Sequence, residues 1–400
     1  MKTIFQFIVL TILFVSCSQF STDDINKAHQ KFLTIDTHID IPIRLTRDST
    51  YNLLEKHPPN HGRTDFPRKY EGGLDAALFV GWTKQKERDE AGNRNANEKA
   101  HKILNVIKDR ITKSSSKAEM AFSSKDIVNI NKSNKHPILI GMENGYPIGK
   151  DISQVEHFYN LGIRYLTLCH TKDNDICDSS TDESEDEGLT RFGIEVVKEL
   201  NRLGIIVDVS HISDSSFYQV MRLSKTPVIA SHSNARALCN HPRNMTDDMI
   251  KVLAKNGGVI QINFVNEYVK SPEENIERDS VIARFKKRYS APNISEAQKE
   301  VLAKEWDEIN IKYPTEKATL NDVINHIDYV VNLVGIDYVG IGSDFDGGGR
   351  VVGIEDVSKM SSITKELFNR GYSEEDIQKI WSGNFLRVFR EVEDFAKELH

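Results

Sequence analysis

The segment FLTIDTHIDIP, residues 32–42, joins a buried-strand pattern to a polar ending. Its apolar residues are typical of a strand in a protein core, and Asp36, His38 and Asp40 place a polar side chain at every second residue. Because alternate side chains of a strand point to the same face, His38 and Asp40 leave the chain on one side and can reach a shared partner. The segment therefore predicts a strand that carries ionisable groups at its carboxyl end.

Seven further apolar runs follow along the chain, separated mostly by amphipathic segments. In one of these, residues 189–204, Ile194, Val197 and Leu200 share a helical face. Continuously apolar strands that alternate with helices predict a parallel sheet covered by helices. Eight strands favour a closed (β/α)8 barrel of the TIM type, and a doubly wound open sheet is the rival architecture. The eight runs are FLTIDTH, LDAALFVGW, HPILIGME, IRYLTLCH, IIVDVSH, TPVIASH, GGVIQINF and YVGIGSDFDG.

Six of the eight runs finish with His, Asp or Glu. In a (β/α)8 barrel the carboxyl ends of all strands surround one mouth, where active sites form. Ionisable groups crowded together inside a protein lose their hydration, so they need ion pairs or a metal in compensation. The groups at these ends are His38 with Asp40, Glu143, His170, His211, His232 and Asp344.

This set of side chains points to metal binding. Imidazoles and carboxylates suit divalent zinc. Three histidines and one to three acids are more ligands than one catalytic zinc requires. The surplus favours a two-metal site, in which two Zn²⁺ ions hold a bridging hydroxide and polarise a carbonyl group.

The composition limits the classes of function. The chain has 400 residues, 39% of them hydrophobic, which is enough for a substantial core. A net charge of −7 argues against a nucleic-acid binder, which would carry a basic patch. We expect one catalytic domain over residues 27–400. A charged insertion at about 270–318, between the seventh and eighth strands, is a candidate lid or a subunit contact in a homodimer.

The N-terminal residues MKTIFQFIVLTILFVSC resemble an export signal. Their apolar stretch is too short for a comfortable membrane span. LFVSC is similar to a bacterial lipobox, which predicts a signal over residues 1–17, a lipid on Cys17 and a polar tether over 18–26. An ordinary cleaved signal that removes Cys17 is the alternative. We expect an exported protein of the bacterial cell envelope, anchored to a membrane through this lipid.

The other cysteines are Cys169, Cys177 and Cys239. Three cysteines cannot form enough disulfides to stabilise a chain of this size, so its stability must come from the hydrophobic core. A Cys169–Cys177 disulfide is open to an exported protein, and the sequence does not decide whether it forms.

Longer stretches around the strand ends resemble the membrane dipeptidase (renal dipeptidase-like) family of the amidohydrolase superfamily. The resemblance runs from about residue 32 to GNFLRVF near the C-terminus, and SHSNARALCNHPRNMTDDM is by itself a specific signature. It implies a di-zinc hydrolase that cleaves dipeptides, L-Xaa-D-Xaa pairs among them. The matching stretches are DTHID, TDFPRKYEGGLDAALF, RYLTLCH, GLTRFGIEVVKELNRLGIIVDVSHIS, PVIASHSNARALCNHPRNMTDDM, GGVIQINFVNEY and VGIGSDFDG.

The resemblance also implies which residues bind the metals. By position, His38 and Asp40 match ligands of one zinc ion. His211 and His232 match ligands of the other. Glu143, in IGMENG, matches the carboxylate that bridges both ions.

Four positions match residues that act on the substrate. His170 matches the residue that contacts the substrate carbonyl and stabilises the tetrahedral intermediate, and Asp344 the acid that handles the proton of the attacking water and the leaving amine. Arg243, in HPRN, matches the arginine that binds the terminal carboxylate, and Tyr268, in NFVNEY, a residue of the substrate pocket. A guanidinium grips a carboxylate through two parallel hydrogen bonds, which would explain a preference for dipeptides.

Other polar residues near the strand ends receive lesser roles. We expect Asp36 to orient His38 as an outer-shell partner. We expect Asp346 to be a structural hydrogen-bonding group. Asp208 and His241 receive no role.

Two other functions remain as alternatives. The first is a different amidohydrolase reaction, such as deamination or lactone hydrolysis. Such relatives typically open with a His-x-His pair and often bridge their metals with a modified lysine, whereas this chain has His38 with Asp40 and, at the bridging position, Glu143. The second is an envelope lipoprotein that binds peptides without cleaving them. Degenerate copies of that kind lose ligands, and this chain retains every one.

Overall fold

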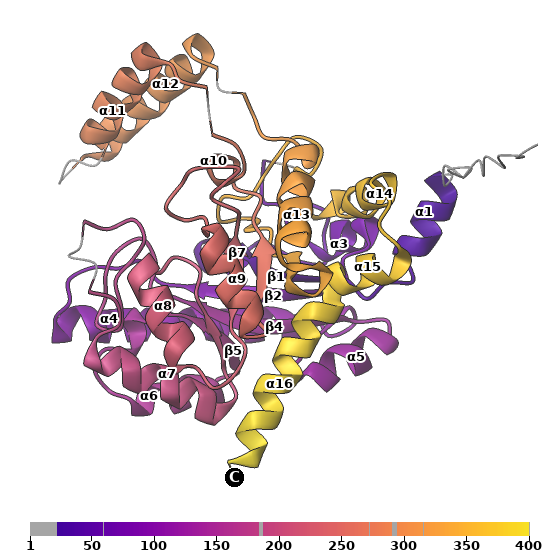
Figure 1. Ribbon diagram of the computed structural model, residues 1–400. Helices are drawn as coiled ribbons and strands as arrows, with labels where there is room; N and C mark the ends of the chain where they lie inside the picture. Colours follow the sequence, from indigo (N-terminus) through magenta and orange to yellow (C-terminus); the bar gives the residue numbers. More distant parts are fainter. Residues whose placement is uncertain are drawn as a thin grey trace, which may run out of the picture.

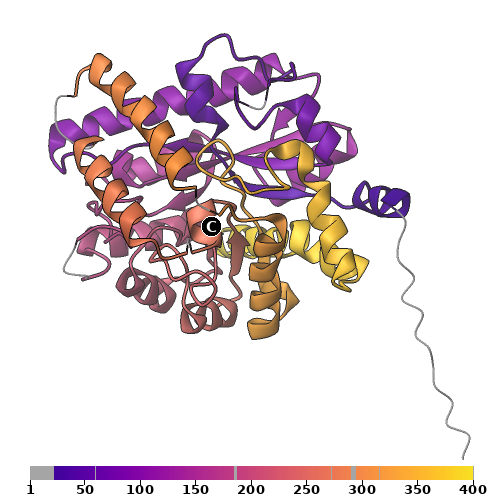
Figure 2. The ribbon, with the colours of Figure 1, turned by 90° about the horizontal axis from the view of Figure 1, so that it is seen from above.

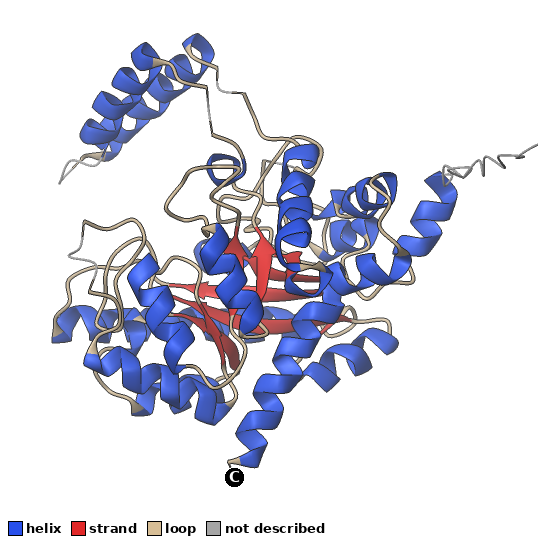
Figure 3. Ribbon diagram, viewed as in Figure 1, coloured by secondary structure: helices blue, strands red, loops and turns tan. Residues whose placement is uncertain are grey.

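The structure is a computed structural model that describes residues 22–58, 60–183, 187–271, 273–289, 294–314 and 316–399. Its centre is a parallel sheet with one strand in each of the eight apolar runs (Figures 1 and 3). In order around the sheet these are β1 (Ile35–Ile39), β2 (Ala76–Trp82), β4 (His136–Glu143), β5 (Ile163–Thr167), β6 (Ile206–Asp208), β7 (Ile229–Ser233), β8 (Val259–Ile262) and β9 (Val339–Ile341). A ninth short strand, β3 (Ala118–Met120), pairs with the start of β4 outside this order.

The first and last strands meet, which closes the sheet. The amide of Asp344 donates to the carbonyl of His38 at 3.0 Å, and the amide of Asp40 donates to the carbonyl of Phe345 at 2.8 Å. The hydroxyl of Thr37 in β1 also donates to the carbonyl of Ile341 in β9, at 3.1 Å. The predicted (β/α)8 barrel is confirmed, and the open sheet is wrong.

Helices cover the outside of the barrel, as the alternation of patterns predicts (Figure 3). In α7 (Arg191–Leu203), Val197 and Leu200 are buried, as predicted, while Ile194 is only half-buried. Ile194 therefore lies at the edge of the buried face of this helix. The other surrounding helices are α2 (Ile41–Arg47), α3 (Phe66–Gly72), α4 (Glu90–Lys113), α5 (Ser124–Lys132), α6 (Ser153–Asn160), α8 (Asp214–Leu223), α9 (Asp247–Lys255), α10 (Asn266–Val269), α13 (Leu320–Val334), α14 (Ser361–Asn369) and α15 (Glu374–Gln378).

The amino-terminal end of the barrel is filled with apolar side chains. Helix α16 (Asn384–Glu398) contributes Phe385, Val388, Phe389 and Val392 to this layer. They pack with side chains from the starts of the strands, so this end is a sealed core and the functional groups lie at the other end. The strand residues of the layer include Ile35, Ala76, Leu78, Leu139, Tyr165, Ile206, Ile229 and Val259.

Helix α1 (Thr22–His29) docks on the side of the barrel. Ile25 and Ala28 are buried, and the His29 ring contacts the carbonyl of Gly72 at 3.0 Å and the hydroxyl of Thr364 at 2.7 Å. The last five residues of the expected tether, 22–26, therefore belong to a docked helix. The predicted signal and Cys17 lie outside the described residues. Across the described ranges, no helix is both long enough and apolar enough to cross a membrane.

The segment expected as a charged insertion, 270–318, contains two antiparallel helices, α11 (Ile276–Tyr289) and α12 (Glu296–Lys312). Figure 1 shows this hairpin above the helices around the barrel, and in Figure 2, seen from above, it lies in front of them. Phe285, Leu302 and Ile309 form a small core of its own. At its base, Lys270 pairs with Glu316 at 2.7 Å.

The three cysteines of the described chain are buried and free. The Cys169 thiol donates to the carbonyl of Asp178 at 3.6 Å, so the loop that contains Asp178 lies against the end of β5. The disulfide that the sequence left open between Cys169 and Cys177 is not formed in the structure.

Candidate active site

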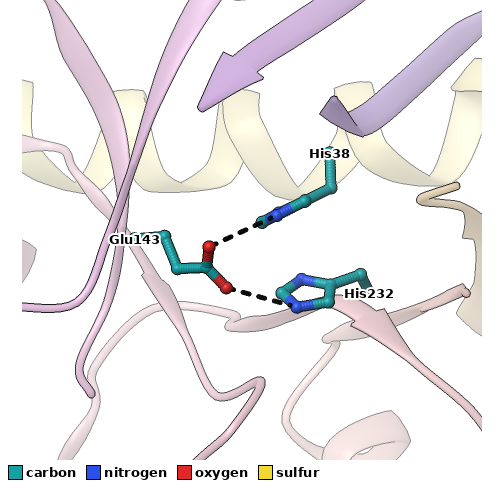
Figure 4. A group of neighbouring side chains, drawn as sticks. All are labelled: His38, Glu143 and His232. Carbon is teal, nitrogen blue, oxygen red and sulfur yellow. Dashed lines mark ion pairs between the residues drawn. The ribbon is translucent and has the colours of Figure 1, made fainter. Parts of the chain in front are cut away.

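Glu143, the last residue of β4, lies at the centre of the converging strand ends. Its Oε2 lies 3.7 Å from Nε2 of His38, and its Oε1 lies 3.0 Å from Nε2 of His211 and 3.4 Å from Nε2 of His232. Figure 4 shows the carboxylate between the rings of His38 and His232. One carboxylate thus faces histidines on two sides with different oxygens.

The remaining strand-end groups surround this carboxylate. Nε2 of His38 lies 3.7 Å from Oδ2 of Asp40, and Nε2 of His170 lies 3.8 Å from Oε1 of Glu143. His38, Asp40 and Asp344 each offer an atom within 4.8 Å of the others. The structure therefore brings together every residue that the sequence proposed as a metal ligand, with His170 and Asp344 beside them.

Burial and mutual charge decide the protonation of this cluster. Burial alone would lower the pKa of His38, but the carboxylates of Glu143 and Asp40 raise that pKa well above its ordinary value. Burial would raise the pKa of Glu143, but the neighbouring histidines hold it well below. Burial also holds the pKa of His211 and that of His232 well below the ordinary value, so both rings are neutral. The neutral rings of His211 and His232 beside the ionised Glu143 are in the protonation states that metal ligands need, and a metal ion at His38 would replace one of its ring protons.

The donor set fits a metal ion. Nε2 of His38 and Oδ1 of Asp40 are buried side-chain atoms without a hydrogen-bond partner. Such atoms are costly in a protein interior unless a ligand satisfies them. Nitrogen and oxygen donors that converge in this way suit zinc and similar divalent ions.

Asp344 and His170 lie at the edge of the cluster. Burial raises the pKa of Asp344 well above its ordinary value, and the adjacent charge of Asp40 adds to this effect. The side chain of His170 is 19% exposed, the most open of the histidines here, and its ring meets the Trp82 ring edge-on at 5.5 Å. These two side chains can therefore meet a molecule that enters from the mouth.

Strained backbone aims several of these side chains. His211, Asp344 and Asp346 have φ values of 72°, 60° and 68°, in the left-handed region that non-glycine residues seldom adopt. A Cβ at Gly347 would collide with Oδ1 of Asp344, so glycine is required there. Asp346 accepts a hydrogen bond from the amide of Arg63 at 2.8 Å, which confirms its structural role.

The His38 ring has a partner that the sequence did not identify. The hydroxyl of Tyr165, in β5, lies 2.9 Å from Nδ1 of His38, and the hydroxyl of Ser231 lies 3.4 Å from the same atom. Asp36 instead accepts from the backbone amides of His38 at 3.1 Å and Ser343 at 2.9 Å. Asp36 therefore contacts His38 through its backbone, while the groups that contact the ring at Nδ1 are the hydroxyls of Tyr165 and Ser231.

Asp208 is a second residue that the sequence did not assign. Its Oδ1 accepts from the amides of Ser210 at 3.0 Å and Ser231 at 2.8 Å. Its Oδ2 accepts from the hydroxyls of Ser231, at 2.7 Å, and Thr167. The carboxylate thus ties β5, β6 and β7 together beneath the cluster. Its place as the only acid of the run IIVDVSH is the signal that could have revealed it.

Arg243 and Tyr268 lie together beside β7. The Arg243 guanidinium donates to the carbonyl of His232 at 3.0 Å and lies 5.5 Å from the centre of the Tyr268 ring. Its Nε is buried without a hydrogen-bond partner, and in the described part of the chain no carboxylate forms an ion pair with it. His241, which received no role, lies 4.6 Å from the Tyr268 ring and accepts from the Arg243 amide. The structure thus supplies a buried positive charge available to an anionic group.

Comparisons with known proteins agree with this arrangement. The chain is 35% identical to "Dipeptidase tcpJ" of Claviceps purpurea, in an alignment that covers 74% of this chain and 58% of that protein. It is 32% identical to "Dipeptidase 3" of Homo sapiens, in an alignment that covers 92% of this chain and 67% of that protein. The crystal structure of the probable dipeptidase PvdM from Pseudomonas aeruginosa, at 29% identity, superposes with a TM-score of 0.82 and covers 94% of this chain and 98% of its own. The family described as "Membrane dipeptidase (Peptidase family M19)" matches residues 22–400. The chain therefore belongs to the membrane dipeptidase family, peptidase family M19.

Proposed function

We propose that this protein is a zinc-dependent dipeptidase that hydrolyses dipeptides, L-Xaa-D-Xaa pairs among them. The observation that carries the proposal is the position of Glu143, whose two oxygens face His38 on one side and His211 with His232 on the other. Two zinc ions bound there would supply a deprotonated water at neutral pH and polarise the scissile carbonyl. The family membership and the names of the curated relatives support the same activity.

The ligands divide into two sets around one carboxylate. His38 and Asp40 would hold one ion, since both leave the end of β1 and lie 3.7 Å apart. His211 and His232 would hold the other, since their Nε2 atoms lie 2.9 Å apart and point to the same place. Glu143 would bind both ions.

Two residues would act on the reacting bond. His170 can donate a hydrogen bond to the carbonyl oxygen as negative charge develops on it, because its ring is the most open to the mouth. Asp344 would accept the proton of the attacking water and deliver it to the leaving amine. This role is supported by an oxygen of Asp344 that lies within 4.8 Å of ligand atoms of His38 and Asp40.

The buried guanidinium would select the length of the substrate. Arg243 would bind the terminal carboxylate of a dipeptide, with Tyr268 against the substrate on the same side. A longer peptide has no carboxylate at this distance from the scissile bond. An amidated dipeptide would leave the guanidinium without a charge partner, and this is costly in a buried site.

Location and assembly also belong to the proposal. A lipid on Cys17 would hold the exported protein at a membrane of the bacterial envelope. Because α1 docks on the barrel from Thr22 onward, only a few residues would separate the lipid from the folded body. The hairpin of α11 and α12 would serve as the contact in a homodimer, or as a lid.

A combined measurement of metal content and hydrolysis tests this function. Purified protein would be loaded with zinc, and the bound zinc ions would be counted by mass spectrometry. The loaded protein would then be incubated with L-Ala-L-Ala, L-Ala-D-Ala, an amidated dipeptide and a tripeptide. We expect two zinc ions per chain and cleavage of the free dipeptides only. A metal-free protein that binds dipeptides unchanged would favour the peptide-binding lipoprotein. Hydrolysis of a lactone or deamination of a base in place of dipeptide cleavage would favour another amidohydrolase reaction.

A further inference from the structure

Two histidines meet on the outer helical layer, away from the barrel mouth. His101 lies within α4 and His157 within α6, and their Nε2 atoms are 2.7 Å apart. The ring centres lie 4.9 Å apart. His101 is half-buried and His157 is exposed, so the point where the nitrogens meet is open to solvent.

The hydrogen bonds of His101 define which nitrogen is free. Its Nδ1 lies 2.9 Å from the carbonyl of Asn97, so Nδ1 carries the proton and donates it. Nε2 of the neutral ring then has a lone pair, which points at Nε2 of His157. Two imidazole nitrogens this close must share one proton between them or share a cation, because two protonated rings would repel each other.

The surrounding contacts hold the two helices in this register. One turn before His101, the Asn97 amide donates to Oε1 of Gln154 and to the carbonyl of Pro147, both at 3.0 Å. Phe158, next to His157, is fully buried and its ring lies 5.4 Å from that of His101. The two imidazoles are therefore placed by packing on both sides, and a ligand would not have to assemble them.

We propose that His101 and His157 bind a divalent transition-metal ion, Zn²⁺ or Cu²⁺, at a surface site separate from the centre at the barrel mouth. Borderline divalent ions of this kind prefer imidazole nitrogen, and water completes the coordination at an exposed site. Zinc bonds of about 2.0–2.1 Å require the two nitrogens to lie about 3.3 Å apart in a tetrahedral site. The His157 ring, which is exposed, would move by about 0.6 Å to reach this spacing. The bound ion would cross-link α4 to α6.

A copper titration of the zinc-loaded full-length protein tests the proposal. The mouth is first saturated with zinc, excess metal is removed, and copper is then added while both metals are counted by mass spectrometry. We expect one copper per chain with unchanged zinc, and an electron paramagnetic resonance signal with hyperfine structure from two nitrogens. The thermal unfolding midpoint should rise when this copper binds.

Variants assign the bound copper to the pair. We expect His101→Gln and His157→Gln each to weaken copper binding at least about tenfold, since loss of even an outer-shell partner has such an effect. His61→Gln, which removes another exposed histidine, should bind copper as the parent protein does. The copper bound by the parent protein minus the copper bound by a variant gives the ion held by the pair, whichever metal ions are bound at the barrel mouth. This count does not depend on the proposed dipeptidase activity. Copper binding that persists in both variants, or a parent protein that binds no copper beyond the zinc centre, would overturn the proposal.

Discussion

The hydroxyl of Tyr165 lies 2.9 Å from Nδ1 of His38 inside the barrel. A metal ion on Nε2 of His38 would leave the ring proton on Nδ1, which would then donate it to the phenol oxygen. Burial raises the pKa of Tyr165 well above its ordinary value, so the phenol stays neutral. Tyr165 therefore helps to hold the ring of a proposed metal ligand in its orientation.

Tyr165→Phe should weaken metal binding while leaving the fold intact. The phenylalanine ring would still fill this place in the barrel, but the His38 ring would lose a hydrogen-bond partner at Nδ1. We expect the affinity for zinc to fall by about 10- to 100-fold, measured by competition with a chelator. Tyr159→Phe, the same change on the outer helix α6, is the control and should bind zinc normally. An unchanged affinity in Tyr165→Phe would show that the hydrogen bond does not support the site.

His232→Ala should remove one of the two proposed zinc ions. We expect dipeptide hydrolysis to fall by at least about a hundredfold, because a catalytic metal contributes several kcal/mol to transition-state stabilisation. Mass spectrometry of the purified variant should count one zinc ion in place of two. His61→Ala, at an exposed position, should retain both ions. A His232→Ala protein with full zinc content and activity would contradict the ligand assignment.

Arg243→Ala should weaken the capture of free dipeptides. Loss of a charge-assisted contact of about 1.5–3 kcal/mol predicts a fall in kcat/KM of about 10- to 150-fold. The rate with amidated dipeptides should change little, so discrimination between the two substrates should shrink. Arg222→Ala, at an exposed arginine in the last turn of α8, is the control. If Arg243→Ala discriminates as the parent does, the carboxylate is bound elsewhere.

Asp208→Asn should destabilise the barrel beneath the site. With Oδ1 kept toward the two backbone amides, the new NH2 group would face the hydroxyls of Ser231 and Thr167, which now donate to this position. The hydrogen bonds to a carboxylate would therefore be lost or weakened with no change in volume. We expect the free energy of unfolding to fall by about 2–4 kcal/mol in urea denaturation. Asp109→Asn, on the exposed face of α4, should change it by less than about 0.5 kcal/mol. Equal effects of the two substitutions would refute the proposed role of the network.

Lys69→Met should change how stability depends on pH. Lys69 is fully buried, its Nζ has no hydrogen-bond partner, and burial lowers its pKa to about 7 although Asp75 and Asp36 partly oppose this. Between pH 7 and the ordinary lysine pKa of 10.5, the unfolded chain binds a proton here that the folded chain does not, so this group makes stability rise with pH.

The methionine variant should lack this rise and be more stable at pH 7, by about 1–3 kcal/mol. Urea denaturation of parent and variant at pH 7, 8 and 9 measures both effects. Lys135→Met, at a half-buried lysine paired with Glu119, should leave the pH dependence unchanged. A variant less stable than the parent at pH 7 would show that the buried amine is stabilising.

The amino-acid sequence was sufficient to predict the strands and the chemistry at their ends. Alternation between apolar runs and amphipathic segments is a local property, and so is the spacing of His38 and Asp40. Once eight parallel strands are assumed, the geometry of a barrel requires their carboxyl ends to meet. Glu143 and His232 could therefore be expected at one mouth although 89 positions separate them in the sequence.

Only the tertiary structure decided which side chains support one another. Nothing local relates Tyr165 to His38, and nothing in their own helices relates His101 to His157. Asp208 could not be assigned a role from the sequence, because its hydrogen-bond partners come from neighbouring strands. Residue types and the local spacing of apolar and polar residues can be read from the sequence, because they involve residues that are close together in the chain. A hydrogen bond between distant segments depends on barrel closure, strand register and helix packing to within a few tenths of an ångström, and these are set by the whole fold.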